Sequence, residues 1–169
     1  MKLSRLTVGW GIYIVISAAF MLQVRKLLFN IFGDAAIMNS LKAVFLLVGI
    51  LSLIYAVRLH VNIYKICAAI GVVTLGYFFA MWQPYFSEKT HVLTYGFLGY
   101  LTSNDLIGER RPRLKNLALA VWYIALISAM DEGFQRLLPY RVGDLRDFIT
   151  NVISGILGLG LFFTLRRNR

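Results

Sequence analysis

The sequence has few of the residues that build disulfide-rich, metal-binding or water-soluble proteins. Its 169 residues include one cysteine, two histidines, three prolines and eight acidic side chains. The single cysteine, Cys67, excludes an intramolecular disulfide, and no CxxC or HExxH spacing signals a zinc site. Charged residues make up 15% of the chain, well below the ~25% of ordinary soluble domains. These shortages disfavour secreted scaffolds, zinc enzymes and soluble globular domains.

The sequence has long apolar runs instead. Hydrophobic residues make up 59% of the chain, and the mean hydropathy is +0.68. Six segments approach the ~20 apolar residues that a membrane helix needs, and no alternating barrel pattern is present. We therefore predict an all-α fold, a polytopic membrane bundle of about five to six transmembrane helices. The predicted helices cover residues 6–28, 43–57, 64–82, 91–102, 117–130 and 148–165.

Three of these segments have features that affect the prediction. The first follows Lys2 and Arg5 as a signal peptide would, but its apolar part continues to Phe29 without a small-residue cleavage site. We therefore expect it to remain a membrane helix. The third is cut by Pro84. The fourth, 91–102, is short and rich in Gly and Tyr, so a buried or re-entrant helix is an alternative to a full crossing.

The basic residues indicate how the chain is oriented. The formal charge is +10, and the lysines and arginines are scattered between apolar runs without forming a stripe, so no nucleic-acid partner is predicted. With six crossings and the N-terminus inside, eleven of the 18 basic residues fall on the inner side. Basic segments 109–115 and 166–169 contribute most to this bias. Both termini are therefore predicted to be cytoplasmic.

Polar side chains gather at the ends of three predicted helices, which this topology places together on the outer face. They occur at residues 88–95, 131–136 and 144–151. Within each cluster, polar residues three or four apart share one helical face. Asp144 also fits the N-cap of the last helix, and Gly155 and Gly158 extend its polar stripe with small residues that permit close helix packing. The pairs and triplets are His91 with Tyr95, Glu132 with Gln135, and Asp144 with Asp147 and Asn151.

A charged side chain within a membrane helix costs about 2.5–3.5 kcal/mol, so these groups are expected to pair. Arg141 has Glu132 or Asp147 as possible partners, and His91 has either acid. A purely structural lock of ion pairs is one interpretation, and a site for a polar or anionic group is another. A divalent metal held by His91, Glu132 and Asp147 is weakly supported, since such a site has one histidine. No metal or cofactor is therefore predicted.

Two stretches carry a resemblance to a known family. EKTHVLTYGFLGYL and DEGFQRLLPYRVGDLRDFITNVISGILG are similar to motifs of the VanZ-like family of bacterial membrane proteins, over residues 84–160. The matching residues are Lys89, His91, Tyr95, Glu132, Gly133, Gln135, Pro139, Arg141, Asp144, Asp147, Asn151 and Gly155. We divide the chain into N-terminal transmembrane helices (1–83) and a VanZ-like core (84–169), packed as a single membrane domain. The resemblance implies the bacterial inner membrane and a link to teicoplanin resistance, and it brings no cofactor or reaction.

These observations leave three functional hypotheses. In the first, the outer-face pocket binds a cell-envelope lipid or lipid-linked saccharide, with Arg141 on a phosphate or carboxylate. Gln135 would contact a hydroxyl or amide in that pocket. The other candidate ligand-binding residues are Asp144, Asp147, Asn151, Lys89 and Tyr95. In the second, a membrane enzyme uses Glu132 or His91 as the general base, with Arg141 and Lys89 stabilising negative charge. In the third, the cluster only locks the helices.

Overall fold

The computed structural model describes residues 2–108, 113–141 and 143–166. Within these ranges the chain is helical and contains no strand, so the all-α prediction is confirmed. Four of the helices, α2, α3, α5 and α6, are long and apolar enough to cross a membrane. The six helices are α1 (Arg5–Ser17), α2 (Met21–Arg58), α3 (Ile63–Trp82), α4 (Phe86–Leu106), α5 (Leu114–Leu137) and α6 (Leu145–Leu165).

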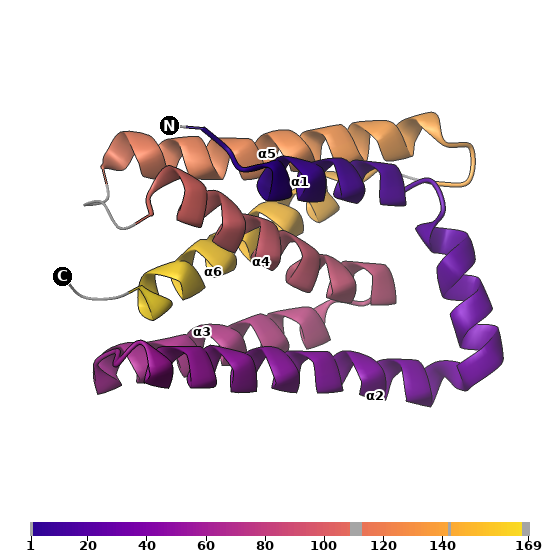
Figure 1. Cartoon of the computed structure of the whole chain (residues 1–169). Coiled ribbons are helices and arrows are strands. Elements are labelled where there is room, and N and C mark those ends of the chain that lie inside the picture. The colour runs from indigo at the N-terminus through magenta and orange to yellow at the C-terminus, as the bar shows by residue number, and fades with distance from the viewer. Residues whose placement is uncertain (1, 109–112, 142, 167–169) are drawn as a thin grey trace.

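Most of the chain runs back and forth along one direction, and the first part of α2 runs across it. In Figure 1, α4 begins and α5 ends at the right-hand side, where the start of α2 descends along the bundle. The orientation of the bundle in a membrane stays a prediction. Residues 109–112 and 167–169, which belong to the two basic segments behind that prediction, lie outside the described residues.

The single helix predicted over residues 6–28 is wrong. Helix α1 ends at Ser17, and α2 begins only at Met21. The intervening turn is held from far along the sequence, because the Tyr140 hydroxyl donates to the carbonyl oxygen of Ala19 at 2.7 Å. Helix α2 is also longer than the predicted 43–57, and it bends at Gly33, where φ is +78°. Glycine adopts that backbone conformation without the steric cost that a Cβ imposes.

Helix α4 is longer than the predicted 91–102. It has 21 residues, enough for about 31 Å at 1.5 Å per residue, and it begins two residues after Pro84. It is nevertheless too polar to count among the four candidate spans. Its surroundings explain the difference, because α4 packs against α1, α3, α5 and α6. A helix enclosed by protein can keep polar side chains that lipid would not solvate.

Helices α4 and α6 cross with their backbones in contact. A Cβ added to Gly99 would overlap the carbonyl oxygen of Gly155, and one added to Gly158 would overlap that of Gly96. This confirms the close packing predicted for Gly155 and Gly158, and it is the usual function of small residues at membrane-helix interfaces. The crossing keeps the first turns of α4 and α6 on the same side of the bundle, where α5 ends.

Candidate functional site

The three polar clusters meet, as the sequence predicted. Hydrogen bonds between side chains join α4 to α6, α6 to α5, and α4 to α5. They run from His91 Nδ1 to Asn151 Oδ1 at 3.0 Å, from Asn151 Nδ2 to Glu132 Oε1 at 3.4 Å, and from the Tyr95 hydroxyl to Asp131 Oδ2 at 2.9 Å. These bonds form two chains that share the end of α5.

The first chain centres on the carboxylate of Asp131, which is 2% exposed. Its Oδ2 accepts from the Tyr95 hydroxyl, and its Oδ1 accepts from Gln135 Nε2 at 3.2 Å. The Gln135 amide is thereby oriented, and its Oε1 accepts from Arg141 Nη2 at 2.7 Å. Both carboxylate oxygens are satisfied by neutral donors. The arginine is therefore held by a neutral amide.

The second chain fixes the orientation of His91. Asn151 Nδ2 donates to Ser128 Oγ at 3.1 Å and to Glu132 Oε1. The amide oxygen of Asn151 therefore faces His91 and accepts from Nδ1–H, which leaves Nε2 as the acceptor nitrogen of the neutral ring. Glu132 Oε2 accepts from the backbone N–H of Asp144 at 3.0 Å. Glu132 thus anchors both Asn151 and the start of α6.

The acidic residues at the start of α6 have structural contacts there. Asp144 is the N-cap, and its side chain accepts from the backbone N–H of Arg146 at 3.0 Å, which confirms the predicted cap. The Arg146 guanidinium forms an ion pair with Glu88 of α4 and lies 3.8 Å from Asp147. This pairing ties the first turn of α6 to that of α4.

The predicted ion pairs are wrong. Within the described ranges, the ion pairs closer than 4 Å involve Arg146, and Arg141 contacts Gln135 rather than Glu132 or Asp147. The neutral amide takes the place of the expected carboxylate partner because Gln135 lies between Arg141 and the buried Asp131. No acid of the described ranges therefore lies within ion-pair distance of Arg141.

Lys89 was predicted as a ligand-binding residue, but it does not line the cavity. Its ammonium group is buried and donates to the backbone carbonyls of Met81, at 3.0 Å, and Gln83. These carbonyls belong to the end of α3, where the last turn has no helical partners. Lys89 therefore closes the α3–α4 connection, and its charge complements the negative end of the α3 dipole.

A cavity of about 140 Å³ lies where α1, α2, α4 and α5 meet. One wall is polar and is formed by α4, the end of α5 and the turn after it. The opposite wall is largely apolar and comes from α1 and the first part of α2, which includes Ile14, Met21, Leu22 and Leu28. The polar side chains are Ser17, Arg25, Ser87, Thr90, His91, Thr94, Tyr95, Asp131, Gln135 and Arg141.

The cavity sorts the predicted site residues into two groups. Those that line it are His91, Tyr95, Gln135 and Arg141. The predicted residues outside its lining are Lys89, Glu132, Asp144, Asp147 and Asn151. Sequence analysis did not select Asp131, Ser128 or Arg25. For Asp131 a signal existed, because it lies four residues before Gln135 and so shares its helical face.

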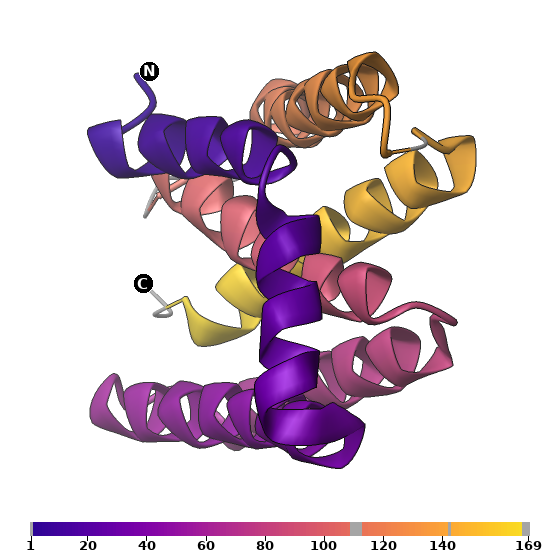
Figure 2. The ribbon, with the colours of Figure 1, turned by 90° about the vertical axis from the view of Figure 1, so that its right-hand side faces the viewer.

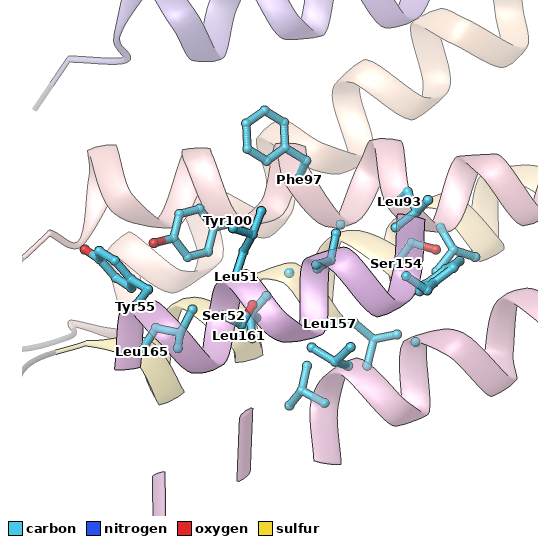
Figure 3. Close-up of a pocket in the computed structure, with 18 residues that line it drawn as sticks. Leu51, Ser52, Tyr55, Leu93, Phe97, Tyr100, Ser154, Leu157, Leu161 and Leu165 are labelled. Carbon is cyan, nitrogen blue, oxygen red and sulfur yellow. The ribbon is translucent and has the colours of Figure 1, made fainter. Parts of the chain in front are cut away.

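A second hollow is larger and different in chemistry. It has a volume of about 340 Å³ and lies between α2, α3, α4 and α6. Figure 3 shows its wall, with Leu51, Phe97, Leu157 and Leu161 among the labelled side chains. No Asp, Glu, Lys, Arg or His of the described chain lines it. Its lining can accommodate hydrocarbon, whereas the lining of the smaller cavity includes charged side chains.

The described side chains include no cluster of three or more His, Cys, Asp and Glu residues placed to hold a metal ion. Comparison with protein families matches residues 11–166 to VanZ/LLP1. The chain belongs to the VanZ/LLP1 family. Comparisons with curated proteins and with solved structures returned no match. The VanZ/LLP1 match extends beyond residues 84–160 and takes in α2 and α3. Together with the four apolar helices, it indicates a membrane protein.

Proposed function

We propose that this VanZ/LLP1 protein binds a cell-envelope lipid or lipid-linked saccharide in the small cavity, with the anionic headgroup on Arg141. The observation that carries the proposal is the two-sided lining of the cavity. Arg141 and Gln135 lie on the polar wall, and α1 and α2 supply the apolar wall. Amphiphiles match this arrangement, because their headgroup and their chain need opposite surroundings within a few ångströms.

The state of Arg141 supports an anionic ligand. Its Nη2 is bound to the neutral Gln135 amide, while its Nε is buried and has no hydrogen-bond acceptor among the described residues. A buried donor left without an acceptor costs roughly 1–3 kcal/mol. A phosphate or carboxylate would accept from this donor and neutralise the charge at the same time.

Catalysis is the second candidate, and the tautomer of His91 favours it. With Nδ1–H held by Asn151, the neutral ring has an acceptor at Nε2 on a residue that lines the cavity. That is the arrangement of a general base. Glu132 does not line the cavity, and both of its oxygens accept hydrogen bonds from the chain. In an enzyme of this geometry, His91 is the base and Glu132 is a positioning residue.

The family also suggests a cellular role. We infer that the protein resides in the bacterial inner membrane with the cavity on the outer side. Occupation of the cavity by an envelope lipid or precursor would then lower susceptibility to teicoplanin. Two observations support this inference. The basic segments favour this orientation, and the chain resembles VanZ-like proteins.

The test compares cells that make equal amounts of folded wild type, Arg141→Gln and His91→Gln. Arg136→Gln is the matched control, because Arg136 is an exposed arginine of the same region that does not line the cavity. Lipids that co-purify with each protein and the total envelope lipids are measured by mass spectrometry, and teicoplanin tolerance is scored in parallel.

The outcomes separate the hypotheses. Binding predicts a co-purifying anionic lipid that Arg141→Gln loses and Arg136→Gln keeps. Catalysis predicts a covalent change in an envelope lipid that disappears with His91→Gln, while the co-purifying lipid is retained. If both cavity variants retain lipid, tolerance and envelope composition as the control does, the cavity is not a functional site. If they fail only by not accumulating, the polar cluster is a helix lock.

A further inference from the structure

The first part of α2, residues 21–32, lies across the end of the bundle where the cavity is. We call these residues the crossing segment. Figure 2 looks onto that end and shows the segment descending in front of the other helices. It begins after the turn held by Tyr140 and Ala19, and it ends at the bend of Gly33. Its direction differs from that of the membrane-crossing helices, as expected for a helix in the membrane interface.

The side chains of the crossing segment fit this placement. Gln23, Lys26 and Asn30 are exposed and spaced three and four apart, so they form one polar face. Leu27 and Ile31, four apart, are 59% and 61% exposed and form an apolar face. A polar face containing lysine beside an apolar face with leucine is typical of helices that lie in the plane of a membrane interface.

The third face of the crossing segment is turned toward the bundle. Leu22, Arg25 and Phe29 are less exposed than their neighbours. Phe29 makes an edge-to-face contact with Phe86 at the start of α4, with ring centroids 5.2 Å apart. Leu22 and Arg25 line the cavity. The segment therefore adds a second arginine to the lining that already includes Arg141.

The charges in the cavity are unbalanced. No carboxylate of the described chain lies within 4 Å of the guanidinium of Arg25 or of Arg141. Asp131 is the one acid that lines the cavity, and its oxygens accept from Tyr95 and Gln135. Two arginines and one carboxylate leave the cavity lining with an excess of positive charge, which a bound anion would neutralise.

We propose that Arg25 and Arg141 together bind the phosphate group of a lipid, with one guanidinium from the crossing segment and one from the turn after α5. This rests on the proposed function and names the class of headgroup. One arginine fork suffices for a carboxylate, which has two oxygens. A terminal phosphate has more acceptor oxygens and up to two negative charges, so it engages both arginines. The hydrocarbon chain leaves past Met21 and Leu28, on the apolar wall.

The experiment uses the full chain purified in an uncharged detergent. Phosphatidate is the probe, phosphatidylcholine is the comparison lipid, and inorganic phosphate is the competitor; binding is measured by native mass spectrometry. Arg25→Gln is compared with Lys26→Gln, which removes the same charge from the next residue without touching the cavity lining. Arg141→Gln tests the proposed function itself. Melting temperatures confirm folding, and Arg25→Lys tests whether a charge alone suffices.

We expect Arg25→Gln to weaken phosphatidate binding by about tenfold or more, as the loss of a charge-assisted hydrogen bond does. Lys26→Gln should bind as wild type, and Arg25→Lys should recover part of the loss. If Arg25→Gln binds like Lys26→Gln while Arg141→Gln is impaired, the two-arginine site is refuted and the proposed function stands. If wild type does not prefer phosphatidate over phosphatidylcholine, the two-arginine phosphate site is refuted. Displacement of phosphatidate by equimolar inorganic phosphate would show that the acyl chains add no affinity and would refute a lipid ligand, whereas displacement only at large excess supports it.

Discussion

Replacing Gly99 with alanine tests the α4–α6 crossing that supports the whole site. The added Cβ would overlap the backbone carbonyl oxygen of Gly155. A side chain in that position could rotate away, but a backbone carbonyl can only move with its helix. The two helices must therefore separate, and the polar network that spans them must stretch.

The size of the effect follows from the geometry. Overpacking a close interface costs about 1–3 kcal/mol. Alanine replaces glycine in an unobstructed helix with a gain of roughly 0.5–1 kcal/mol. Gly71 of α3 is the matched control, because an added Cβ there has no atom within 4 Å. Because that gain applies at both positions, Gly99→Ala should be less stable than Gly71→Ala by about 1–3 kcal/mol.

The free energy of unfolding is measured by titrating the purified protein in mixed micelles with a denaturing detergent, followed by circular dichroism. A second measurement follows the His91 ring by NMR, because the 3.0 Å bond from His91 to Asn151 crosses the same interface. Equal stability of the two alanine variants would refute the backbone contact. An unchanged His91 signal in a destabilised Gly99→Ala would refute its coupling to the site.

Two further predictions concern the polar network. Asn151→Leu removes hydrogen bonds to three side chains. At about 0.6 kcal/mol for each bond between membrane helices, the free energy of unfolding should fall by roughly 2 kcal/mol. Nitrogen-15 NMR should then show that the His91 ring no longer has a single tautomer. The second prediction concerns the ion pair of Glu88 and Arg146, whose side chains are 4% and 50% exposed. Arg146→Gln leaves the buried carboxylate of Glu88 unpaired and should lower stability by about 1–3 kcal/mol, whereas Glu88→Gln should change stability very little. The opposite order of stability in micelle unfolding would contradict the burial of Glu88.

Much of the second half of the fold follows from local rules. Pro84 ends α3, Asp144 caps α6, and the glycines of α6 mark its contact with α4. The break between α1 and α2 does not follow from them, because residues 18–20 contain neither proline nor glycine. Within this break the carbonyl oxygen of Ala19 accepts from the Tyr140 hydroxyl, 121 positions away. A contact of that range is not encoded in any local pattern.

The site divides in the same way. Spacing and the predicted topology placed His91, Tyr95, Gln135 and Arg141 near one another, and the structure lines one cavity with all four. Spacing did not show which of two adjacent acids faces the cavity. Neighbouring residues on a helix point about 100° apart, at 3.6 residues per turn, so the choice depends on how α5 is rotated in the bundle. That rotation directs Asp131 into the cavity and turns its neighbour toward α6.

The polarity of α4 has a consequence for biogenesis. Helix α4 is not among the four described helices that are apolar enough to cross a membrane unaided, and two of its neighbours, α5 and α6, follow it in the chain. The ribosome thus delivers α4 before two of its four neighbouring helices have been synthesised, including α6, which packs most extensively against it. We expect a chain truncated before α5 to leave α4 outside the bilayer in a translocation assay. Synthesis of α6 would then bring α4 into the membrane, so the functional end would be assembled only after the last helix enters.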